Sequence, residues 1–541
     1  MRLERILRVE LESRRTSFEP LSAAERRMLG GAALGVRLLH DQLSERIDPL
    51  HPAAPWILSI GPLSGTALSP RAQAAITHLS PLTGGVNDSL VSHAVAEALA
   101  AAGIAALILT GRSESPVWLR LGAQGVEIED ARSLWSQDLG RTAQALESRH
   151  AAAALIVGSA AQSGVPYASL GTGGHSAGRG GAGAALAAKN VKAIAARRGS
   201  ARAAAGGRKN SGGEAREPRG ARAARRLLQL NELRALPTRN FRERSFPEAP
   251  ALARALNAGG RYGRLPYEAA FAFGPLLGIS SAECVRRCLE ACDRVGLDVI
   301  SAGGTLAWAI EAARAGVLPE RLLEFGQAEP LEPILESIAS RVGVGELLAL
   351  GSRAAGRQLG GQAGHWAMHV RGLEIPGYDP RAFPSLALGY AIGSRGACHV
   401  RSGAYQIDLD SPHADPPEAA EVARRAVESE DASTLLDSLI FNRSWRSDLG
   451  DPFEGAARLL DEAGERDLAD TEALRETMRC VSSLRRRINL AQGWRPEEDG
   501  LPERLLRESG GASSALDAAR LRAWIASYYT LRGWSAEGRP A

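Results

Sequence analysis

Lysine is nearly absent from this chain of 541 residues, since only Lys189, Lys192 and Lys209 are lysine and the other basic residues are arginine. The 65 basic residues almost balance the 61 acidic ones, which leaves a net charge of +4. Nothing in this charge balance calls for a nucleic-acid partner. Aromatic residues make up only 5% of the chain. We therefore expect closely packed helices and backbones with few large side-chain anchors.

Cysteine and long apolar runs are also scarce. Five cysteines in 541 residues cannot form a disulfide framework. The N-terminal segment MRLERILRVELES is charged and alternating, which is not typical of a signal peptide. The best apolar run, Ala94 to Leu109, contains Glu97 and is too short to cross a membrane. We predict a soluble, cytoplasmic protein without a membrane anchor.

Composition divides the chain into three kinds of segment. Residues 6–19 alternate and predict a hairpin, and short apolar runs continue to Lys192 between Gly/Ser/Thr/Pro loops, as in a sheet-rich α+β domain. Residues 199–224 lack apolar periodicity and aromatic residues for base stacking, which favours a solvated linker over a nucleic-acid-binding arm. The chain then becomes helical. The predicted parts are an N-terminal domain (1–198), a linker (199–224) and helical domains 2 (225–385) and 3 (386–541).

Two glycine-containing loops are candidate binding elements. Residues 178–183 precede an Ala-rich stretch, and glycines before a helix let backbone N–H groups approach an anion. The alternative is a tight turn against a helix, because the segment is neither a dinucleotide fingerprint nor a Walker loop. Residues 80–85 form a polar glycine turn, which on its own indicates only a loop.

Cys284, Cys288 and Cys292 lie four residues apart and share one face of a predicted helix. Iron–sulfur ligands normally come from a loop that wraps the cluster, which favours reading these cysteines as small buried hydrophobes. His365 and His369 lack the glutamate of a zinc motif. We predict no protein ligands to a metal among these residues.

Glu268 and His399 are titratable residues that lie close to proline or glycine in the sequence. Either can act as a general acid or base if it is buried near a substrate. The spacing of the chain shows no Ser-His-Asp triad.

Several blocks of the sequence, taken together, resemble the tungsten-containing aldehyde ferredoxin oxidoreductases over nearly the whole length of the chain. The blocks occur in family order: ILRVEL near the start, LGGAALGVRLL (29–39), GPLSGT (61–66), SPLTGGVNDS (80–89), SAGRGGAGAALAAKNVKAI (176–194), NELRALPTRNFR (231–242), PYEAAFAFGPLLGI (266–279), CDRVGLDVISAGGTLAWAIE (292–311), VRGLEIPGYDPRA (370–382), GYAIGSRGACHVR (389–401) and LLDSLIFNR (435–443). So many collinear blocks make the resemblance specific.

The resemblance implies an α+β fold in which two packed β-sheets form the base for a bis-pterin cofactor and two mostly helical domains cover it. It also implies oxidation of an aldehyde to a carboxylate at tungsten or molybdenum, with electrons leaving through a [4Fe–4S] cluster to ferredoxin. Glu268 and His399 match the family's general acid/base positions. The expected cofactor-binding residues are Arg71, Ser92, Arg179, Asp293, Leu297 and Asp298.

The redox parts of the family pattern are missing. The family carries a C-x2-C-x3-C run where this chain has the short, cysteine-free span from Glu243 to Pro266, and its fourth cluster cysteine corresponds to Asn442. Thiolates hold such clusters, and asparagine does not replace one. We therefore predict that the [4Fe–4S] cluster is absent.

The pterin site is also altered. The family's arginine before SPLTGG falls at Gln73, although Arg71 can replace it after a small shift. Where the family has a glycine near this loop, this chain has Ser92. Where the family has Arg-Ala before AGRGG, this chain has His175-Ser176. Each arginine lost opposite a phosphate removes charge-assisted hydrogen bonds of about 1.5–3 kcal/mol. The cofactor is then bound differently, weakly or not at all.

The sequence leaves three hypotheses open. The chain is a divergent enzyme that keeps a tungsto- or molybdo-bis-pterin and passes electrons to a ferredoxin-like protein or redox partner subunit. Alternatively, it is a catalytically degenerate paralogue that acts as a scaffold, regulatory or ligand-binding subunit. The third possibility is a new activity in the old pocket. Homo- or hetero-oligomers are expected in either of the first two cases.

Overall fold

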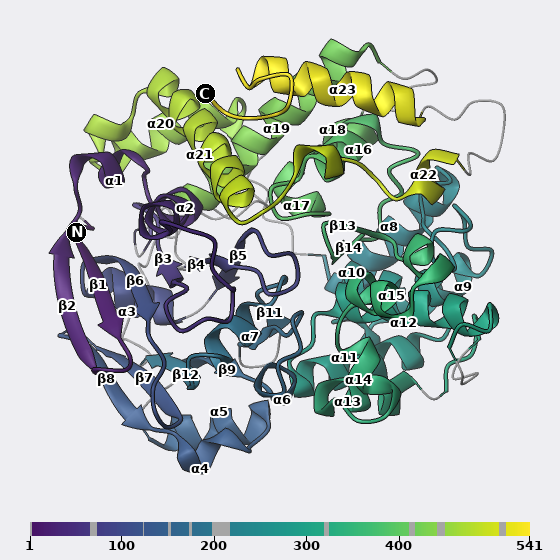
Figure 1. Cartoon of the computed structure of the whole chain (residues 1–541), viewed down its shortest axis with the longest axis horizontal. Coiled ribbons are helices and arrows are strands. Elements are labelled where there is room, and N and C mark those ends of the chain that lie inside the picture. Colours follow the sequence, from purple (N-terminus) through teal and green to yellow (C-terminus); the bar gives the residue numbers. More distant parts are fainter. Residues whose placement is uncertain are drawn as a thin grey trace. The chain divides into compact units, whose positions relative to one another are not determined.

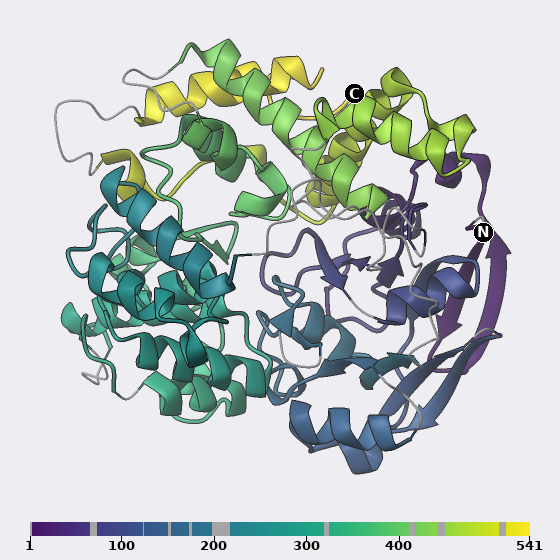
Figure 2. The ribbon, with the colours of Figure 1, turned by 180° about the vertical axis from the view of Figure 1, so that it is seen from behind.

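The computed structural model describes most of the chain. The described residues are 3–64, 66, 73–92, 94–122, 124–149, 153–172, 176–196, 217–318, 324–329, 331–410, 417–440, 449–507 and 516–541. They form two compact units (Figures 1 and 2). Unit 1 combines Met1–Glu214 with Asp431–Trp494, and unit 2 combines Ala215–Glu430 with Arg495–Arg539.

Unit 1 contains two six-stranded sheets, which confirms the predicted sheet-rich N-terminal part. The first has the order β2-β1-β6-β3-β4-β5 and the second β11-β10-β9-β12-β7-β8. The strands are β1 (Arg5–Glu10), β2 (Arg15–Pro20), β3 (Trp56–Ser59), β4 (Gln73–Leu79), β5 (Val86–Ser92), β6 (Ile104–Thr110), β7 (Val117–Gly122), β8 (Gly125–Asp130), β9 (Ala153–Val157), β10 (Leu170–Gly171), β11 (Ser176–Ala177) and β12 (Val191–Ala196).

The pairing of the strands follows from their sequence patterns. The predicted N-terminal hairpin is confirmed, because β1 pairs antiparallel with β2 from Arg5 opposite Pro20 to Glu10 opposite Arg15. Strands β3 and β12 lie inside their sheets and are buried along their whole length, so they are apolar without strict alternation. Parallel pairing occurs between β1 and β6 and between β7 and β12. The outer strand β2 is instead mostly exposed.

Helices cover and connect the two sheets of unit 1. They are α1 (Ala23–Arg27), α2 (Gly31–Gln42), α3 (Ala94–Ala101), α4 (Arg132–Trp135), α5 (Leu139–Ser148), α6 (Ser159–Gln162), α7 (Ala182–Ala187), α20 (Pro452–Glu462), η5 (Arg466–Leu468) and α21 (Thr471–Ala491). Helix α3 contacts strands of both sheets. Helix α2 lies directly on β4, since a Cβ at Gly35 would stand 2.3 Å from Oγ1 of Thr77. Glycine at position 35 thus permits close packing of the helix on the strand.

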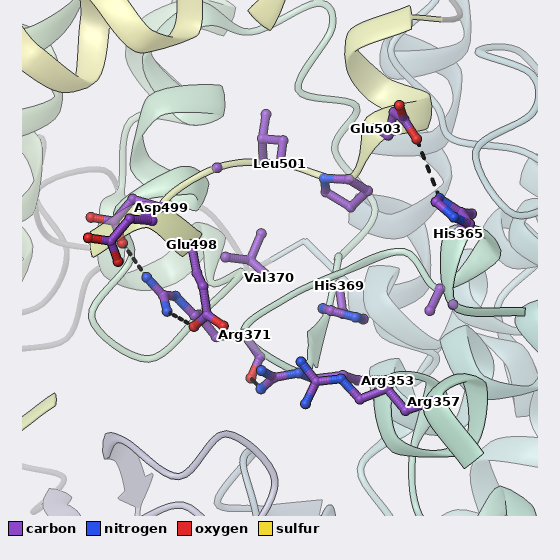
Figure 3. Close-up of a pocket in the computed structure, with 15 residues that line it drawn as sticks. Arg353, Arg357, His365, His369, Val370, Arg371, Glu498, Asp499, Leu501 and Glu503 are labelled. Carbon is purple, nitrogen blue, oxygen red and sulfur yellow. Dashed lines mark hydrogen bonds and ion pairs between the residues drawn. The ribbon is translucent and has the colours of Figure 1, made fainter. Parts of the chain in front are cut away.

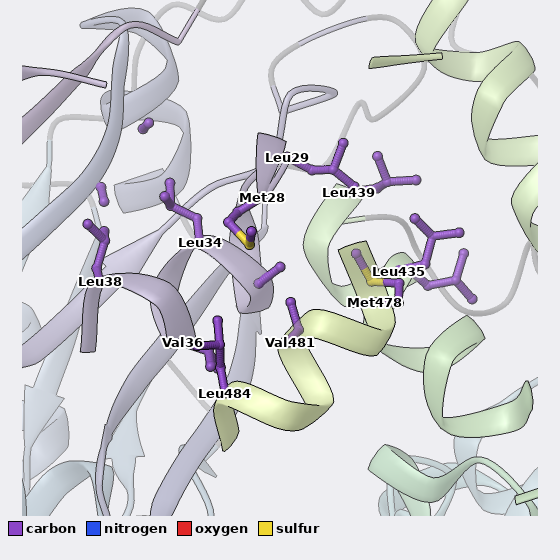
Figure 4. Close-up of a cluster of buried hydrophobic side chains, with 14 of the residues drawn as sticks. Met28, Leu29, Leu34, Val36, Leu38, Leu435, Leu439, Met478, Val481 and Leu484 are labelled. Atoms are coloured by element: carbon purple, nitrogen blue, oxygen red, sulfur yellow. The ribbon is translucent and has the colours of Figure 1, made fainter. Parts of the chain in front are cut away.

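A large apolar cluster of unit 1 joins parts that are far apart in sequence (Figure 4). Val36 of α2 lies beside Leu484 of α21, and Leu34, Leu38, Met478 and Val481 belong to the same cluster. The apolar positions of α21 recur every three or four residues, which gives the helix one buried face. Burying a side chain of this size contributes about 1.5–3 kcal/mol.

This packing changes the predicted domain division. Residues 431–494 belong to unit 1 and not to a separate C-terminal domain that begins at 386. The Asn489 side chain accepts a hydrogen bond from the backbone N–H of Val86 at 2.7 Å, and the Trp494 indole N–H donates to the Thr83 carbonyl at 3.0 Å. The spacing of apolar residues in α21 predicts that one face of the helix is buried, but it does not predict which element covers that face.

Unit 2 is mostly helical, as predicted for the chain after residue 225. Its elements are α8 (Arg219–Glu232), α9 (Ala249–Asn257), η1 (Gly260–Tyr262), α10 (Tyr267–Ala272), η2 (Pro275–Leu277), α11 (Ala282–Val295), α12 (Val299–Arg314), α13 (Leu331–Ser340), α14 (Val344–Leu348), α15 (Ser352–Leu359), η3 (Gly361–Trp366), β13 (His369–Val370), β14 (Leu373–Glu374), α16 (Pro384–Ala391), α17 (His399–Ser402), α18 (Tyr405–Asp410), η6 (Pro496–Glu498), α22 (Glu503–Arg507) and α23 (Ala518–Leu531). Helix α19 (Ala419–Leu439) contains the boundary between the units. Helix α12 is buried along nearly its whole length.

Two further expectations concern the linker and the membrane. Residues 199–216 of the predicted linker (199–224) lie outside the described residues, but α8 already begins at Arg219. The buried positions of α8 include Gly220, Ala223 and Ala224. These small residues are also typical of linkers, so the sequence did not indicate the start of the helix. Among the helices that the structure describes, none is both long and apolar enough to span a membrane.

Two of the three lysines are buried in unit 1 and bonded to carbonyl oxygens. Lys189 donates to the Pro52 carbonyl at 2.7 Å, and Lys192 donates to the carbonyls of Trp135 at 3.2 Å and Gln137 at 2.9 Å. Burial lowers the pKa of each ammonium group from 10.5 to about 8. The folded state therefore holds these charges at neutral pH at the expense of stability.

Replacing Lys192 by methionine is expected to change how stability depends on pH. Between about pH 8 and 10.5 the unfolded wild-type chain binds more protons at this residue than the folded chain. The free energy of unfolding of the wild type minus that of the variant should therefore rise through this window, by at most about 1.4 kcal/mol per pH unit. Below this window the difference should be flat. Urea unfolding at several pH values measures it, and a difference independent of pH would contradict a lowered pKa.

Candidate active site

Glu268 and His399, the two predicted proton-transfer residues, lie together in unit 2. Nε2 of His399 is 3.5 Å from Oε1 of Glu268. The Glu268 side chain is 38% exposed, whereas the His399 side chain is only 7% exposed. The carboxylate is therefore in contact with solvent, whereas the imidazole lies inside the protein. The two residues are 131 positions apart in the sequence.

Local backbone features place each of the two side chains. Pro266 stands at the N-cap of α10, and Glu268 lies in the first turn, where the helix dipole favours a carboxylate. His399 opens the short helix α17, which ends at Gly403 with φ of +63°. The turn before α17 requires glycine at 396, because φ is +94° and a Cβ would stand 2.4 Å from the Val370 carbonyl oxygen.

Tyrosine rings surround the imidazole of His399. The ring centroid of Tyr378 is 4.9 Å from that of His399, and the centroid of Tyr405 is 5.5 Å away. Tyr267 adjoins Tyr378 with centroids 5.4 Å apart and donates a hydrogen bond to the Gly377 carbonyl. These contacts fix the orientation of the imidazole and exclude water from its faces.

Tyr267 and Tyr378 remain neutral in this setting. Burial raises the pKa of Tyr267 and of Tyr378 well above the usual value, and the charge of Glu268 adds to the effect in both. The guanidinium of Arg226 lies about 6 Å from two of the rings, 6.0 Å from Tyr378 and 5.9 Å from Tyr405. Sequence reasoning did not select any of these residues. The only available signal was that Tyr267 and Tyr378 lie inside two of the blocks that carry the resemblance.

The predicted cofactor residues of unit 2 follow α11. Asp293 is partly buried on the last turn of the helix, and Leu297 is fully buried. Gly296 ends α11 in the left-handed conformation, and Asp298 caps α12 by accepting the Ser301 N–H at 2.8 Å. One oxygen of Asp298 is therefore used within the fold, whereas Asp293 presents a carboxylate partly exposed at the helix end.

In unit 1, the two glycine loops singled out in the sequence lie against each other. The Ser80 hydroxyl donates to the Gly180 carbonyl at 2.7 Å, and the Asn87 side chain donates to the Arg179 carbonyl at 3.0 Å. Gly180 has φ of +92°, and a Cβ there would stand 2.4 Å from Oδ1 of Asn87. Gly84 has φ of +75° and open space on its Cβ side. The 178–181 loop is thus a tight turn, and its Arg179 side chain is only partly buried.

Other predicted positions are not placed by the structure. Arg71, His175 and Asn442 lie outside the described residues, and only the backbone of Ser92 is described. Gln73 is the first residue of β4, paired with Ser92 of β5. Whether Arg71 replaces the family's arginine at Gln73 therefore stays a prediction.

The cysteines of α11 are buried, as the small-hydrophobe interpretation predicts. Cys284, Cys288 and Cys292 are 8%, 1% and 0% exposed, and the sulfur atoms of the first two are 4.0 Å apart. Burial raises the pKa of the Cys292 thiol well above its usual value, which disfavours the thiolate that binds metals. Over the residues that the structure describes, no three His, Cys, Asp or Glu side chains are grouped to hold a metal ion.

The span in which the family carries three cluster cysteines is ordered here without them. Between Glu243 and Pro266 the chain forms α9, whose Leu252 and Leu256 are buried, and η1. Helix α9 packs against α8. Apolar packing between α9 and its neighbours therefore contributes to holding this segment in place.

Comparisons with known proteins agree along the whole chain. Residues 6–198 match the family described as aldehyde ferredoxin oxidoreductase, N-terminal domain, and residues 251–541 match its domains 2 and 3. The tungsten-containing aldehyde ferredoxin oxidoreductase of Thermococcus kodakarensis is 30% identical over 596 aligned positions, covering 99% of this chain and 96% of that protein. The enzyme of the same name from Pyrococcus furiosus is 29% identical, covering 95% and 93%.

A more distant relative and a structural neighbour are named as parts of larger complexes. The WOR-like subunit of the aliphatic sulfonate oxidoreductase of Pyrococcus furiosus is 25% identical, covering 70% of this chain and 72% of that protein. A chain of the active site complex BamBC of benzoyl coenzyme A reductase superimposes with a TM-score of 0.84 at 18% identity, covering 100% and 96%. That likeness shows the fold. The family matches together show that this chain belongs to the aldehyde ferredoxin oxidoreductase family.

Proposed function

We propose that the chain is an oxidoreductase that converts an aldehyde to a carboxylate, with Glu268 and His399 transferring the protons. The observation that carries this proposal is the 3.5 Å distance between the Glu268 and His399 side chains, beside tyrosine rings that contact the imidazole. A carboxylate and an imidazole that lie 131 positions apart in sequence meet here in the arrangement that acid–base chemistry uses.

The proton balance of the reaction explains why two such groups are useful. An aldehyde and a water molecule give a carboxylate, three protons and two electrons, so protons must leave the reacting atoms. Glu268 is in contact with solvent and accepts a proton from the attacking water. His399 lies within 3.5 Å and shares that proton through Nε2. The rings of Tyr378 and Tyr405 hold the imidazole in the orientation that this transfer needs.

The residues present fit a pterin-bound metal in part. In unit 1, Arg179 offers a guanidinium beside a glycine turn, which suits a phosphate. In unit 2, the carboxylate of Asp293 suits the N–H donors of a pterin ring, with Leu297 and Asp298 shaping the same turn; Arg71 and Ser92 are the further proposed contacts. When bound, such a tungsten or molybdenum cofactor supplies oxygen-atom transfer and accepts the two electrons.

The residues do not fit a [4Fe–4S] cluster. The span from Glu243 to Pro266 has no thiol, and the cysteines of α11 are buried in apolar packing. We therefore propose that electrons leave to a separate redox protein, either a ferredoxin-like protein or a partner subunit. The relative named as a WOR-like subunit and the complex named BamBC support a multi-subunit arrangement.

Aldehyde-dependent reduction of a viologen dye tests the proposed reaction. The protein is purified without oxygen from its native host and supplied with short aliphatic and aromatic aldehydes. Dye reduction with formation of the corresponding carboxylate is expected. Protein that contains tungsten or molybdenum but reduces no dye with any aldehyde would contradict the proposal.

A second function, that of a cofactor-free scaffold or regulatory subunit, is favoured by a different observation. The chain lacks all four cluster cysteines and has Gln73 where the family has an arginine. A degenerate paralogue would be expected to lose residues that bind both the [4Fe–4S] cluster and the pterin cofactor. Protein that carries no metal and copurifies with an active relative would support this function instead.

A further inference from the structure

Unit 2 contains a pocket of about 370 Å³ whose lining includes neither Glu268 nor His399 (Figure 3). One side is formed by α15, η3 and the hairpin of β13 and β14. The other side is formed by residues 497–503, which run from η6 into α22. The hairpin turn consists of Arg371 and Gly372, both with positive φ, at +58° and +98°. This is the two-residue turn that suits the twist of a hairpin.

The acidic groups on the lining are largely neutralised by partners within the protein. Arg371 pairs at 2.5 Å with each of Glu498 and Asp499. Glu503 pairs with Arg507 and lies 3.4 Å from Nδ1 of His365. Glu497 is the exception, an exposed carboxylate with no such partner among the described residues.

The basic groups on the opposite side are not neutralised. Arg353 and Arg357 lie one turn apart on α15 and extend side by side near the ring of His369 (Figure 3). The Arg353 guanidinium donates to the Arg371 carbonyl at 3.0 Å and has no carboxylate partner within ion-pair distance in the described chain. Arg357 has neither a hydrogen bond nor an ion pair to any residue that the structure describes.

His369 adds a neutral donor to this side. Burial and the charges of Arg353 and Arg357 lower the pKa of His369 to about 3. Its Nδ1 accepts the Gly372 N–H at 3.2 Å, so the ring proton is on Nε2. Burial lowers the pKa of the Arg353 guanidinium, and repulsion by the charge of Arg357 adds to the lowering. An anion would relieve this repulsion.

We propose that this pocket binds the oxyanion group, a carboxylate or phosphate, of a small metabolite through Arg353, Arg357 and His369. Guanidinium groups match the geometry of both oxyanions with paired hydrogen bonds. A volume of about 370 Å³ falls at the lower end of small-molecule pockets, which suits a small metabolite. The site does not depend on the proposed redox reaction, since none of its residues takes part in it.

Isothermal titration calorimetry with two probes, inorganic phosphate and succinate, tests the proposal on the full chain in chloride-free buffer. The double substitution R353Q/R357Q should weaken binding at least about tenfold. The control R141Q removes one guanidinium charge, as R357Q alone does, from a side chain of unit 1 that is 79% exposed, and it should bind as the wild type does. The probe that binds more tightly identifies the oxyanion.

Three outcomes would overturn the proposal. They are failure of both probes to bind the folded wild type at about 10 mM, equal binding by wild type and R353Q/R357Q, and equal weakening in R141Q. Circular dichroism checks that each variant is folded. If the double variant does not fold, R357Q replaces it. Arg357 is exposed and makes no contact that the fold needs, so R357Q alone should weaken binding several-fold, and unchanged binding would overturn the proposal.

Discussion

Replacing Glu268 by glutamine is expected to lower kcat for aldehyde oxidation by about 10²- to 10⁴-fold, because an amide cannot accept the proton that a carboxylate accepts. The substitution keeps the shape of the side chain and its hydrogen-bonding oxygen. The Glu268 side chain is 38% exposed, so the loss of its charge should disturb the fold little. The viologen-dye assay measures the effect under substrate saturation.

A matched control and a second variant show whether the effect is chemical. E290Q makes the same change on α11 of the same unit at a side chain that is 57% exposed, and it should leave kcat unchanged. H399Q should lower kcat as well, and the double variant should be no slower than the slower single one, because the two groups act as a unit. An E268Q protein with wild-type kcat would remove Glu268 from the mechanism.

Replacing Arg371 by methionine is expected to lower the free energy of unfolding of unit 2 by about 3–5 kcal/mol, because it leaves the buried carboxylate of Asp499 without its arginine counter-charge. The Arg371 and Asp499 side chains are each 3% exposed and lie 2.5 Å apart. The guanidinium also donates to the Arg495 carbonyl at 2.8 Å. The Tyr529 hydroxyl, which donates to the other Asp499 oxygen at 2.5 Å, cannot replace the lost charge.

The same cluster provides the control for this substitution. Arg495 contacts the other oxygen of Glu498 at 3.0 Å, but its side chain is 72% exposed, so R495M should cost less than about 1 kcal/mol. Urea unfolding followed by tryptophan fluorescence measures both variants, with separate transitions fitted for the two units. Equal effects of R371M and R495M would mean that burial of the Arg371–Asp499 pair contributes nothing.

Features fixed by local pattern could be predicted from the sequence. The alternation of residues 6–19 predicted the hairpin of β1 and β2, and the apolar runs to Lys192 predicted a sheet-rich part. The helical spacing of Cys284, Cys288 and Cys292 predicted one face of a helix, and all three are buried. The family resemblance selected Glu268 and His399, which the structure brings within 3.5 Å.

Features that depend on distant partners could not be predicted. The apolar stripe of α21 is evident in the sequence. Its packing on α2, more than 400 residues away, is determined by the tertiary structure and not by the local pattern. The tyrosines around His399 come from α10, α18 and the loop after β14, and no spacing rule connects them. The start of α8 was concealed because Ala223 and Ala224 bury little side chain and match linker composition.

The metal content of the protein purified without oxygen from its native host tests the central claim most directly. Plasma mass spectrometry would quantify tungsten, molybdenum and iron against protein concentration. The proposed enzyme predicts close to one tungsten or molybdenum per chain and no iron, since the family's cluster cysteines are missing at Glu243 to Pro266 and at Asn442. About four irons per chain would contradict the loss of the cluster. The absence of tungsten and molybdenum would contradict the enzyme itself.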